Sequence, residues 1–201
     1  NNVLKTFSIE NEPVVELVNN REREYIFADL PDIGYSTDID TVMASSYQVK
    51  KQLQQIVKIE QPITNTLLYK RILRIWNLTR VTTRLQVFID SLLEDAYKDP
   101  LSGDTIIYWE NKEKAKECDF YRINSKRDIL DIPILEVMSA ARYAIEQQIS
   151  MPIEDLKRLT SQLLGFSRKG NNLDMVTEQT IQLLINKGIF SHANGMVSMN
   201  N

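Results

Sequence analysis

The residues best suited to chemistry in this sequence are cations and hydroxyl groups that gather in two places, and they fit the binding of phosphate. Guanidinium and ammonium groups pair with phosphate oxygens, while hydroxyl groups and the amides at helix N-termini donate hydrogen bonds to them. One group lies in and after a basic helix, and the second repeats part of that pattern further on. We therefore predict a nucleic-acid contact made by Lys70, Arg71, Arg74, Thr79, Arg80, Thr83, Arg84, Arg168, Lys169 and Asn171.

A structural role is the alternative for two of these arginines. Arg80 and Arg168 each follow a hydroxyl residue at a corner between two expected helices. Either side chain could hold a carboxylate or a helix carbonyl at its corner, and that role would explain the repetition equally well. Arg84 and Lys169 are expected to face solvent.

Residues for catalysis, or for binding a metal or cofactor, are not apparent in the sequence. It has no phosphate-binding Gly-x-x-x-x-Gly-Lys-Ser/Thr motif, and its single cysteine and single histidine exclude the usual zinc sites. The stretch from Asp104 to Lys112 has the outline of a magnesium-dependent nuclease strand. That pattern is short and lacks the mixed α/β core it would need, so we favour a hairpin with a charged tip. We expect no catalytic residue, no metal and no cofactor.

The two basic groups lie at equivalent positions of an internal repeat. Residues 75–80 (IWNLTR) align with residues 163–168 (LLGFSR), 88 positions later. In each copy an amphipathic helix ends in an apolar-(Ser/Thr)-Arg corner, and another amphipathic helix follows. This is the sequence form of a helix-turn-helix, in which Thr79 or Ser167 would cap the second helix. Chance alignment of two amphipathic helix pairs is the alternative.

Apolar periodicity places three helices and a hairpin in each copy. In the first copy Pro62 ends one helix, Thr64 caps the next, and Thr105–Trp109 and Phe120–Ile123 form a hairpin around a charged loop. In the second copy Asn194-Gly195 forms the turn of a shorter hairpin. Three helices followed by a hairpin, or wing, are the parts of a winged helix.

We therefore predict a mainly α fold with small β-hairpins (α+β), built from two tandem winged-helix modules at residues 43–123 and 124–201. Residues 1–42 are expected to form an irregular acidic arm or linker that drapes over the rest or leads in from a preceding domain. The arm and its junction, residues 1–48, carry three Lys/Arg against nine Asp/Glu, whereas residues 49–95 carry eight against four. The net charge of −3 thus conceals a basic module beside an acidic arm.

Several blocks of residues carry a family resemblance. They are Val57–Ile63 (VKIEQPI), Leu67–Ile72 (LLYKRI), Leu78–Arg80 with Arg84, Tyr108-Trp109 and Leu163–Arg168. The stretch that holds them resembles the domain of unknown function 3320, found near the C-terminal end of large bacterial proteins related to superfamily-1 DNA helicases. Asn77 departs from the pattern because the family often has glycine there, and the glycine usual near Thr82 is absent. The first corner is therefore expected to bend differently.

The resemblance implies an accessory domain of a DNA-processing ATPase, and it implies no catalytic residue. The expected partners are DNA and the helicase-type ATPase and Vsr-like endonuclease domains of a larger parent protein, of which this chain would be a piece. A protein–protein interaction module and a tandem winged-helix transcription regulator are the alternatives. No apolar run approaches the length of a membrane span, so we expect a cytoplasmic protein without a membrane partner.

Overall fold

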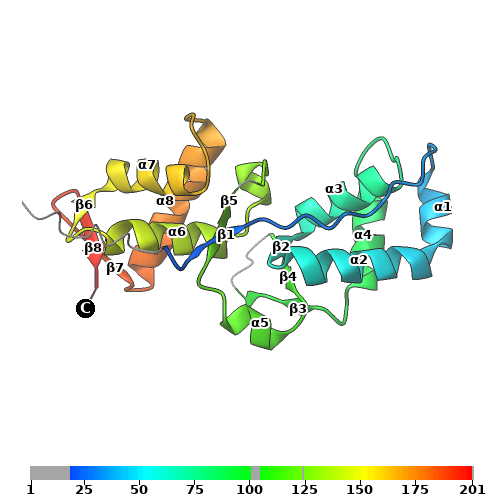
Figure 1. The fold of residues 1–201 in the computed structure, drawn as a ribbon, viewed down its shortest axis with the longest axis horizontal. Helices are drawn as coiled ribbons and strands as arrows, with labels where there is room; N and C mark the ends of the chain where they lie inside the picture. The colour runs from blue at the N-terminus through cyan, green and yellow to red at the C-terminus, as the bar shows by residue number, and fades with distance from the viewer. Residues whose placement is uncertain (1–18, 101–104, 124, 201) are drawn as a thin grey trace, which may run out of the picture.

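Two groups of helices, each with a small sheet, lie one after the other along the long axis of the molecule (Figure 1). The computed structural model describes residues 19–100, 105–123 and 125–200. The fold is mixed α/β, and the described residues form helices α1 to α8 and short, mostly antiparallel strand pairs. None of these helices is both long and apolar enough to cross a membrane.

The first unit packs its helices around a core that includes the fully buried Leu53, Leu68 and Ile72. Its three strands form an antiparallel sheet in the order β2-β4-β3. The sequence expectations hold for α2, which ends just before Pro62, and for Thr64, whose hydroxyl accepts a hydrogen bond from the Leu67 amide as the cap of α3. The elements are α1 (Ile39–Ala44), α2 (Ser46–Glu60), β2 (Ile63–Thr64), α3 (Asn65–Ile75), α4 (Thr83–Leu92), β3 (Tyr97–Lys98) and β4 (Ile107–Trp109).

The second unit has the same order of elements and the same sheet topology. Its core includes the fully buried Leu156, Ile181 and Leu184, and its sheet has the order β6-β8-β7. Asn194 and Gly195 both adopt positive φ and join β7 to β8, which confirms the predicted hairpin turn. The elements are α6 (Ile134–Glu146), β6 (Met151–Pro152), α7 (Ile153–Leu163), α8 (Asn171–Asn186), β7 (Phe190–Ala193) and β8 (Met196–Met199).

The repeat in the sequence is a repeat in the structure. α2, β2, α3 and α4 begin at residues 46, 63, 65 and 83, and α6, β6, α7 and α8 begin at residues 134, 151, 153 and 171. Each pair of starting residues is therefore separated by the same 88 positions as the sequence motif. Leu68 and its counterpart Leu156 are both fully buried. Chance alignment of amphipathic helices does not produce this agreement in several elements at once.

The corner after the first helix of each pair has one backbone conformation in both units. Asn77 has φ +47° and its counterpart Gly165 has φ +88°. In each corner the next amide donates to the carbonyl five residues earlier: Leu78 to Leu73 at 2.9 Å, and Phe166 to Ser161 at 3.0 Å. This is the Schellman pattern, in which a left-handed residue ends a helix. Asparagine tolerates that region better than other residues with a Cβ, so the first corner keeps the glycine geometry and does not bend differently.

The helix caps after these corners differ from those predicted. Thr82 caps α4, accepting a hydrogen bond from the Leu85 amide at 3.2 Å, whereas Thr79 is an exposed corner residue. In the second unit Gly170 stands at the cap position of α8, and Ser167 lies three residues earlier. Both corners are therefore longer by three residues than the predicted helix-turn-helix, because the left-handed turn needs room before the next helix can start.

The first hairpin is also different from the prediction. β4 pairs with β2 on one side and β3 on the other, so it has no free edge for a strand at residues 120–123. The charged loop instead holds a short helix, α5 (Lys112–Lys116), capped by Asn111. β5 (Tyr121–Ile123) pairs in parallel with β1 (Glu22–Glu24). The predicted wing strand thus belongs to a different sheet.

Residues 19–38, which we call the strap, run across both units before α1 begins (Figure 1). At one end β1 pairs with β5 and Arg21 binds Asp119 and Glu146. At the other end the Ile33 amide donates to the carbonyl of Ile75, and the Thr37 hydroxyl donates to the carbonyl of Trp76. The part of the predicted arm that the structure describes therefore drapes over the rest, while residues 1–18 lie outside the described part.

Candidate nucleic-acid interface

The two corners present the cations that are most available to a ligand. Arg80, Arg168 and Lys169 are exposed, and Thr79 is exposed beside Arg80. Within the part of the chain that the structure describes, none of these three cations forms an ion pair. The structural alternative for the two arginines, a clamp on a carboxylate or carbonyl, therefore finds no partner among the described residues. Asn171, also exposed, is the first residue of α8 next to the second corner.

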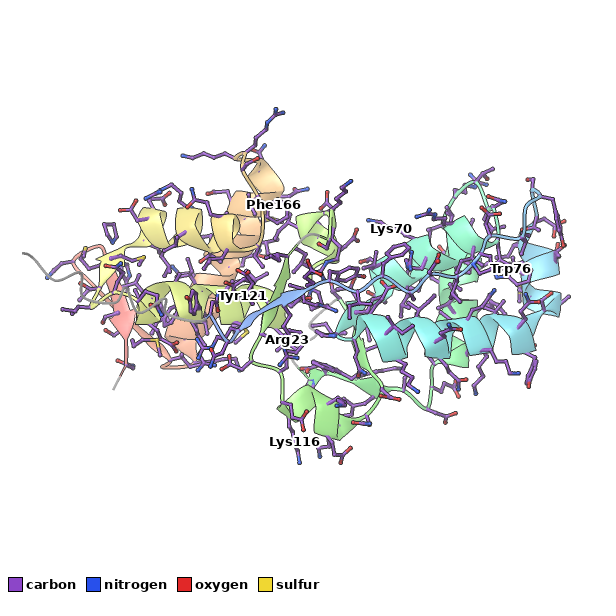
Figure 2. The ribbon with its side chains drawn as sticks, in the orientation of Figure 1. Arg23, Lys70, Trp76, Lys116, Tyr121 and Phe166 are labelled. Atoms are coloured by element: carbon purple, nitrogen blue, oxygen red, sulfur yellow. The ribbon has the colours of Figure 1, made fainter. Side chains whose placement is uncertain are left out.

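The two corners lie along the same long edge of the molecule. Figure 1 views the structure down its shortest axis, and both the α3–α4 loop and the α7–α8 loop reach its upper edge. In Figure 2, Phe166 of the second corner and Lys70 on α3 lie toward this edge, while Lys116 on α5 lies at the opposite edge. The internal repeat thus places Arg80 and Arg168 in equivalent positions of units whose corners face the same way.

Two of the predicted contact residues, Lys70 and Arg84, are exposed but already have partners in the protein. Lys70 Nζ donates to both carboxylate oxygens of Asp131, at 2.8 and 2.7 Å, and so joins α3 to the second half of the chain. Arg84 forms an ion pair of 2.7 Å with Asp40, and both side chains remain more than half exposed. An exposed pair of this kind is weak and easily exchanged. Arg84 and Lys70 remain reachable, although each is partly neutralised.

Arg71 is not available to a ligand, which corrects its prediction as a contact. Its side chain is 7% exposed, and Nη2 donates to Glu60 at 2.6 Å and to the carbonyl of Ala28 at 2.7 Å. The ring of Phe27 lies 3.3 Å from its guanidinium carbon. Arg71 therefore fastens the strap to the first unit. Arg74, one turn further on, is exposed and 5.7 Å from the same ring, and Thr83 is exposed at the start of α4.

The outer face of α4 is apolar rather than basic. A shallow groove of about 360 Å³ lies along it, lined by Met43 of α1 and by α4 residues that include Val87 and Phe88. Val87 is 65% exposed. The only cation that lines this groove among the described residues is Arg84, which Asp40 balances. The face is therefore poorly suited to phosphate and better suited to an apolar partner.

The second unit has a groove of about 330 Å³ between α7 and α8, and its charges are mixed. Lys157 lies in it and reaches Glu154, Asp174 and Glu178 at 3.3, 2.8 and 3.2 Å. Burial alone would lower the pKa of Lys157, but the hydrogen bonds that it donates to these carboxylates outweigh the effect of burial and raise the pKa. Lys157 therefore ties α7 to α8, as Tyr69 ties α3 to α4 through Asp90 in the first unit. Arg168 and Lys169 line the open end of the groove.

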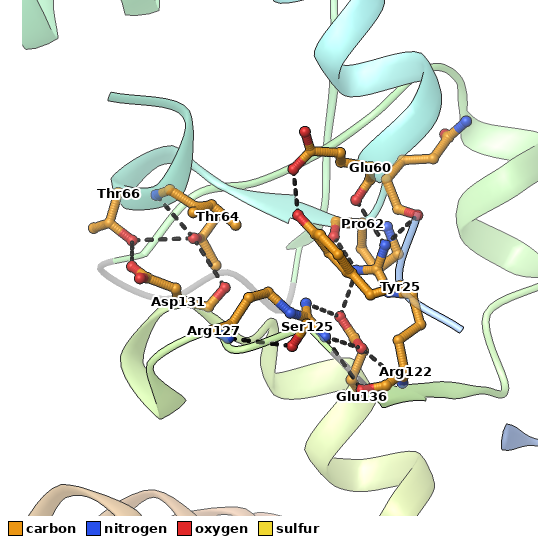
Figure 3. Close-up of polar contacts among 12 residues, drawn as sticks. Tyr25, Glu60, Pro62, Thr64, Thr66, Arg122, Ser125, Arg127, Asp131 and Glu136 are labelled. Carbon is orange, nitrogen blue, oxygen red and sulfur yellow. Dashed lines mark hydrogen bonds and ion pairs between the residues drawn. The ribbon is translucent and has the colours of Figure 1, made fainter. Parts of the chain in front are cut away.

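A buried network of charges joins the two units (Figure 3). Arg122 of β5 donates to the carbonyls of Glu60, Gln61 and Pro62, where α2 turns into β2, at 2.8, 3.2 and 2.6 Å. The same guanidinium binds Glu136 of α6 at 2.5 Å. One arginine thus spans from the backbone of the first unit to a carboxylate of the second.

Further groups complete this network around Glu136, which has no exposed surface. Arg127 binds both of its carboxylate oxygens, at 2.8 and 2.9 Å. The ring of Tyr25, from the strap, lies within 5 Å of both Arg122 and Arg127, and its hydroxyl donates to Glu60. Burial alone would raise the pKa of Glu136, but the charges and hydrogen bonds of the two arginines outweigh it and lower the pKa to about 2.

Sequence reasoning did not predict this junction, although one signal was present. Glu60 continues the buried stripe of α2, and Glu136 stands among the buried residues of α6. A carboxylate at a position that periodicity assigns to the core needs a buried cation as its partner. That rule points to an ion pair, but it does not say which of the arginines supplies it.

Residues 44–87 match the model of a protein family described as a protein of unknown function, DUF3320. This segment resembles DUF3320. The resemblance predicted from the VKIEQPI and LLYKRI blocks is thereby confirmed. The DUF3320 match runs from the end of α1 into α4, and it includes Glu60, Arg71 and the first corner with Asn77 and Arg80. No curated protein and no solved structure gives a significant match to the chain.

The nuclease-like pattern gains no support from the described geometry. Asp104, its first residue, lies outside the described residues. Elsewhere, where the structure is described, no group of three or more His, Cys, Asp or Glu side chains lies close enough together to hold a metal ion.

Proposed function

We propose that the chain is a non-catalytic accessory module that contacts nucleic acid through two winged-helix units. The order helix, strand, helix, helix, strand, strand occurs twice, and in each sheet the last strand lies in the middle. In a helix-turn-helix the corner and the start of the second helix approach the nucleic acid. The observation that carries this proposal is that Arg80 and Arg168, at equivalent corners, are exposed and have no ion-pair partner among the described residues.

The expected contact is with phosphate and not with bases through α4. The exposed cations at the corners can reach the phosphate oxygens of a nucleic acid, whereas the outer face of α4 offers Val87 and Arg84, which Asp40 partly neutralises. We propose that the parent protein processes DNA, which is the setting that the resemblance to DUF3320 implies. Within it we propose a helicase-type ATPase and a nuclease domain as neighbours, and the cytoplasm as the compartment.

Fluorescence anisotropy with labelled DNA tests this proposal. Wild-type chain should bind duplex DNA at low salt, with an affinity that falls as salt rises. The double variant Arg80→Glu/Arg168→Glu should lose about tenfold or more at low salt, because each change replaces an attraction to phosphate by a repulsion. Both side chains are exposed and form no ion pair with a residue that the structure describes, so circular dichroism should show an unchanged fold.

The matched control is Lys112→Glu/Lys116→Glu on α5, at the opposite edge (Figure 2). It makes the same change in net charge and should leave binding nearly unchanged. Equal losses in the two double variants would mean that only net charge matters, and they would contradict a contact at the corners. Absence of salt-sensitive binding by the wild-type chain would contradict the proposal altogether.

A protein-docking function is the second candidate, and the apolar groove of α1 and α4 favours it. Its exposed Val87 and half-buried Met43 and Phe88 could take apolar side chains of a partner domain. If this groove is the functional surface, Val87→Glu should abolish binding to the neighbouring domains of the parent protein and leave DNA binding intact. The opposite pattern would favour the corners.

A further inference from the structure

We infer that both corners bind one nucleic-acid duplex at the same time, as a single rigid footprint whose spacing the buried junction fixes. This inference rests on the proposed function and adds to it a class of ligand, duplex over single strand, and a minimum length. It depends on three observations: the direction of the corners, the rigidity of the junction, and the cations at both ends.

The corners face the same way on an elongated molecule. Both reach one long edge when the molecule is viewed along its shortest dimension (Figure 1). A linear ligand lying along that edge would meet the α3–α4 corner and the α7–α8 corner in turn. Arg74 and Lys70, both exposed on α3, lie in the first unit, and Lys126 is exposed in the turn before the second.

The junction leaves the units little freedom to swing. Rotating one unit against the other would take Arg122 away from the carbonyls of residues 60–62 or away from Glu136. Glu136 is completely buried, so separating it from its arginines would leave an uncompensated charge in the protein interior. The Lys70–Asp131 pair and the strap make two more ties between the units. The distance between the corners is therefore a fixed property of the fold.

A ligand that is as rigid as the protein gains the most affinity from two contact sites held at a fixed distance. Duplex DNA is almost straight over the length of a protein domain, since its persistence length is about 150 base pairs. Once one corner is bound, a duplex that reaches the other corner meets it at high effective concentration. A flexible single strand must instead lose conformational freedom to reach both. Duplexes long enough to span the corners should thus bind more tightly than short duplexes or single strands.

The test is a length series of labelled duplexes, from about 8 to about 30 base pairs, with single strands of the same lengths as comparison. Affinity of the wild-type chain should rise steeply by about tenfold or more at the length that reaches both corners, and then level off. Arg80→Glu alone and Arg168→Glu alone should each abolish this step, because each leaves one working corner. Sedimentation should show one chain on one spanning duplex.

The outcomes separate this inference from the proposed function. Salt-sensitive binding that involves Arg80 and Arg168 but increases only gradually with length, or two short duplexes bound per chain, would overturn the single footprint and leave the function standing. A step in the length series that survives either single variant would overturn it as well. Absence of any salt-sensitive binding would overturn both.

Discussion

Glu136 carries its charge inside the protein because two arginines surround it. Arg127 binds it through two hydrogen bonds, and Arg122 adds one from its side chain and one from its backbone amide. A buried carboxylate without such partners would take up a proton. Removing its charge would leave two guanidinium groups buried without their counter-ion, which costs more than the hydrogen bonds alone.

We therefore predict that Glu136→Gln lowers the free energy of unfolding at pH 7 by about 3–5 kcal/mol. Urea denaturation followed by circular dichroism measures this change. The control is Glu113→Gln on the exposed α5, expected to change stability by less than about 0.5 kcal/mol. The same substitution at both sites separates burial from the mere loss of a negative charge.

The difference in free energy of unfolding between wild type and Glu136→Gln should also depend on pH. The pKa of Glu136 falls from an ordinary 4.5 to about 2 on folding. Its contribution to stability is therefore complete above pH 5 and lost as the pH falls toward 2. The gap between wild type and Glu136→Gln should shrink over that range, and a gap independent of pH would contradict the assignment.

The corners between helices show that the sequence alone does not determine at which residue a helix begins. Residues 79–83 (TRVTT) offer three hydroxyl groups, each able to cap a helix. The left-handed Asn77 and its following turn occupy the first of these positions, so α4 starts only after Thr82. The conformation at Asn77 decides the cap, and that conformation was not apparent because the position holds no glycine.

Thr82→Ala should lower the free energy of unfolding by about 1 kcal/mol, because it removes the hydrogen bond to the Leu85 amide. Thr79→Ala, three residues earlier, is the matched control and should have almost no effect on stability. Thermal or urea unfolding of the two variants measures both. A larger loss of stability in Thr79→Ala than in Thr82→Ala would show that Thr79 is the cap, as the sequence pattern predicted.

Much of each unit could be predicted from the sequence, because its signals are local. The order of helices, the stop at Pro62 and the Asn194-Gly195 turn each depend on a few neighbouring residues. The pairing of β1 with β5 joins residues 99 positions apart and leaves no such signal. Among the candidate site residues, the positions of Arg80 and Arg168 followed from the repeat. The burial of Arg71 depends on the strap, which periodicity within a helix does not reveal.

The whole molecule is two similar units joined by the buried charge network, the Lys70–Asp131 pair and the strap. Both tryptophans, Trp76 and Trp109, are buried and belong to the first unit, whereas each unit has helices of its own. Trp76 lies in the core of the first unit, whereas the apolar cluster that contains Trp109 also includes Ile134 and Leu135 of α6. Tryptophan fluorescence therefore reports on the first unit and its contact with α6, and far-ultraviolet circular dichroism reports on the sum. Coincidence of the two signals measures how far the units unfold together.

Arg122→Met should separate these two signals. The wild-type chain should show one urea transition by both methods, because the junction couples the units. The variant loses the hydrogen bonds to three carbonyls of the first unit but leaves Arg127 on Glu136, so the midpoints by fluorescence and dichroism should differ. Lys116→Met, at an exposed site, should keep them coincident. Coincident midpoints in Arg122→Met would show that the remaining ties, the strap and the Lys70–Asp131 pair, suffice for coupling.

The strap also determines the order in which the chain can fold during its synthesis on the ribosome. Glu22 precedes its strand partner Tyr121 by 99 residues, and Arg21 precedes Glu146 by 125. Synthesis proceeds at roughly 5–20 residues per second, so β1 waits for several seconds after it emerges. During that time its backbone amides and carbonyls are open to pairing with a strand of another chain. A nascent chain arrested before β5 is therefore the form of this protein most prone to aggregate.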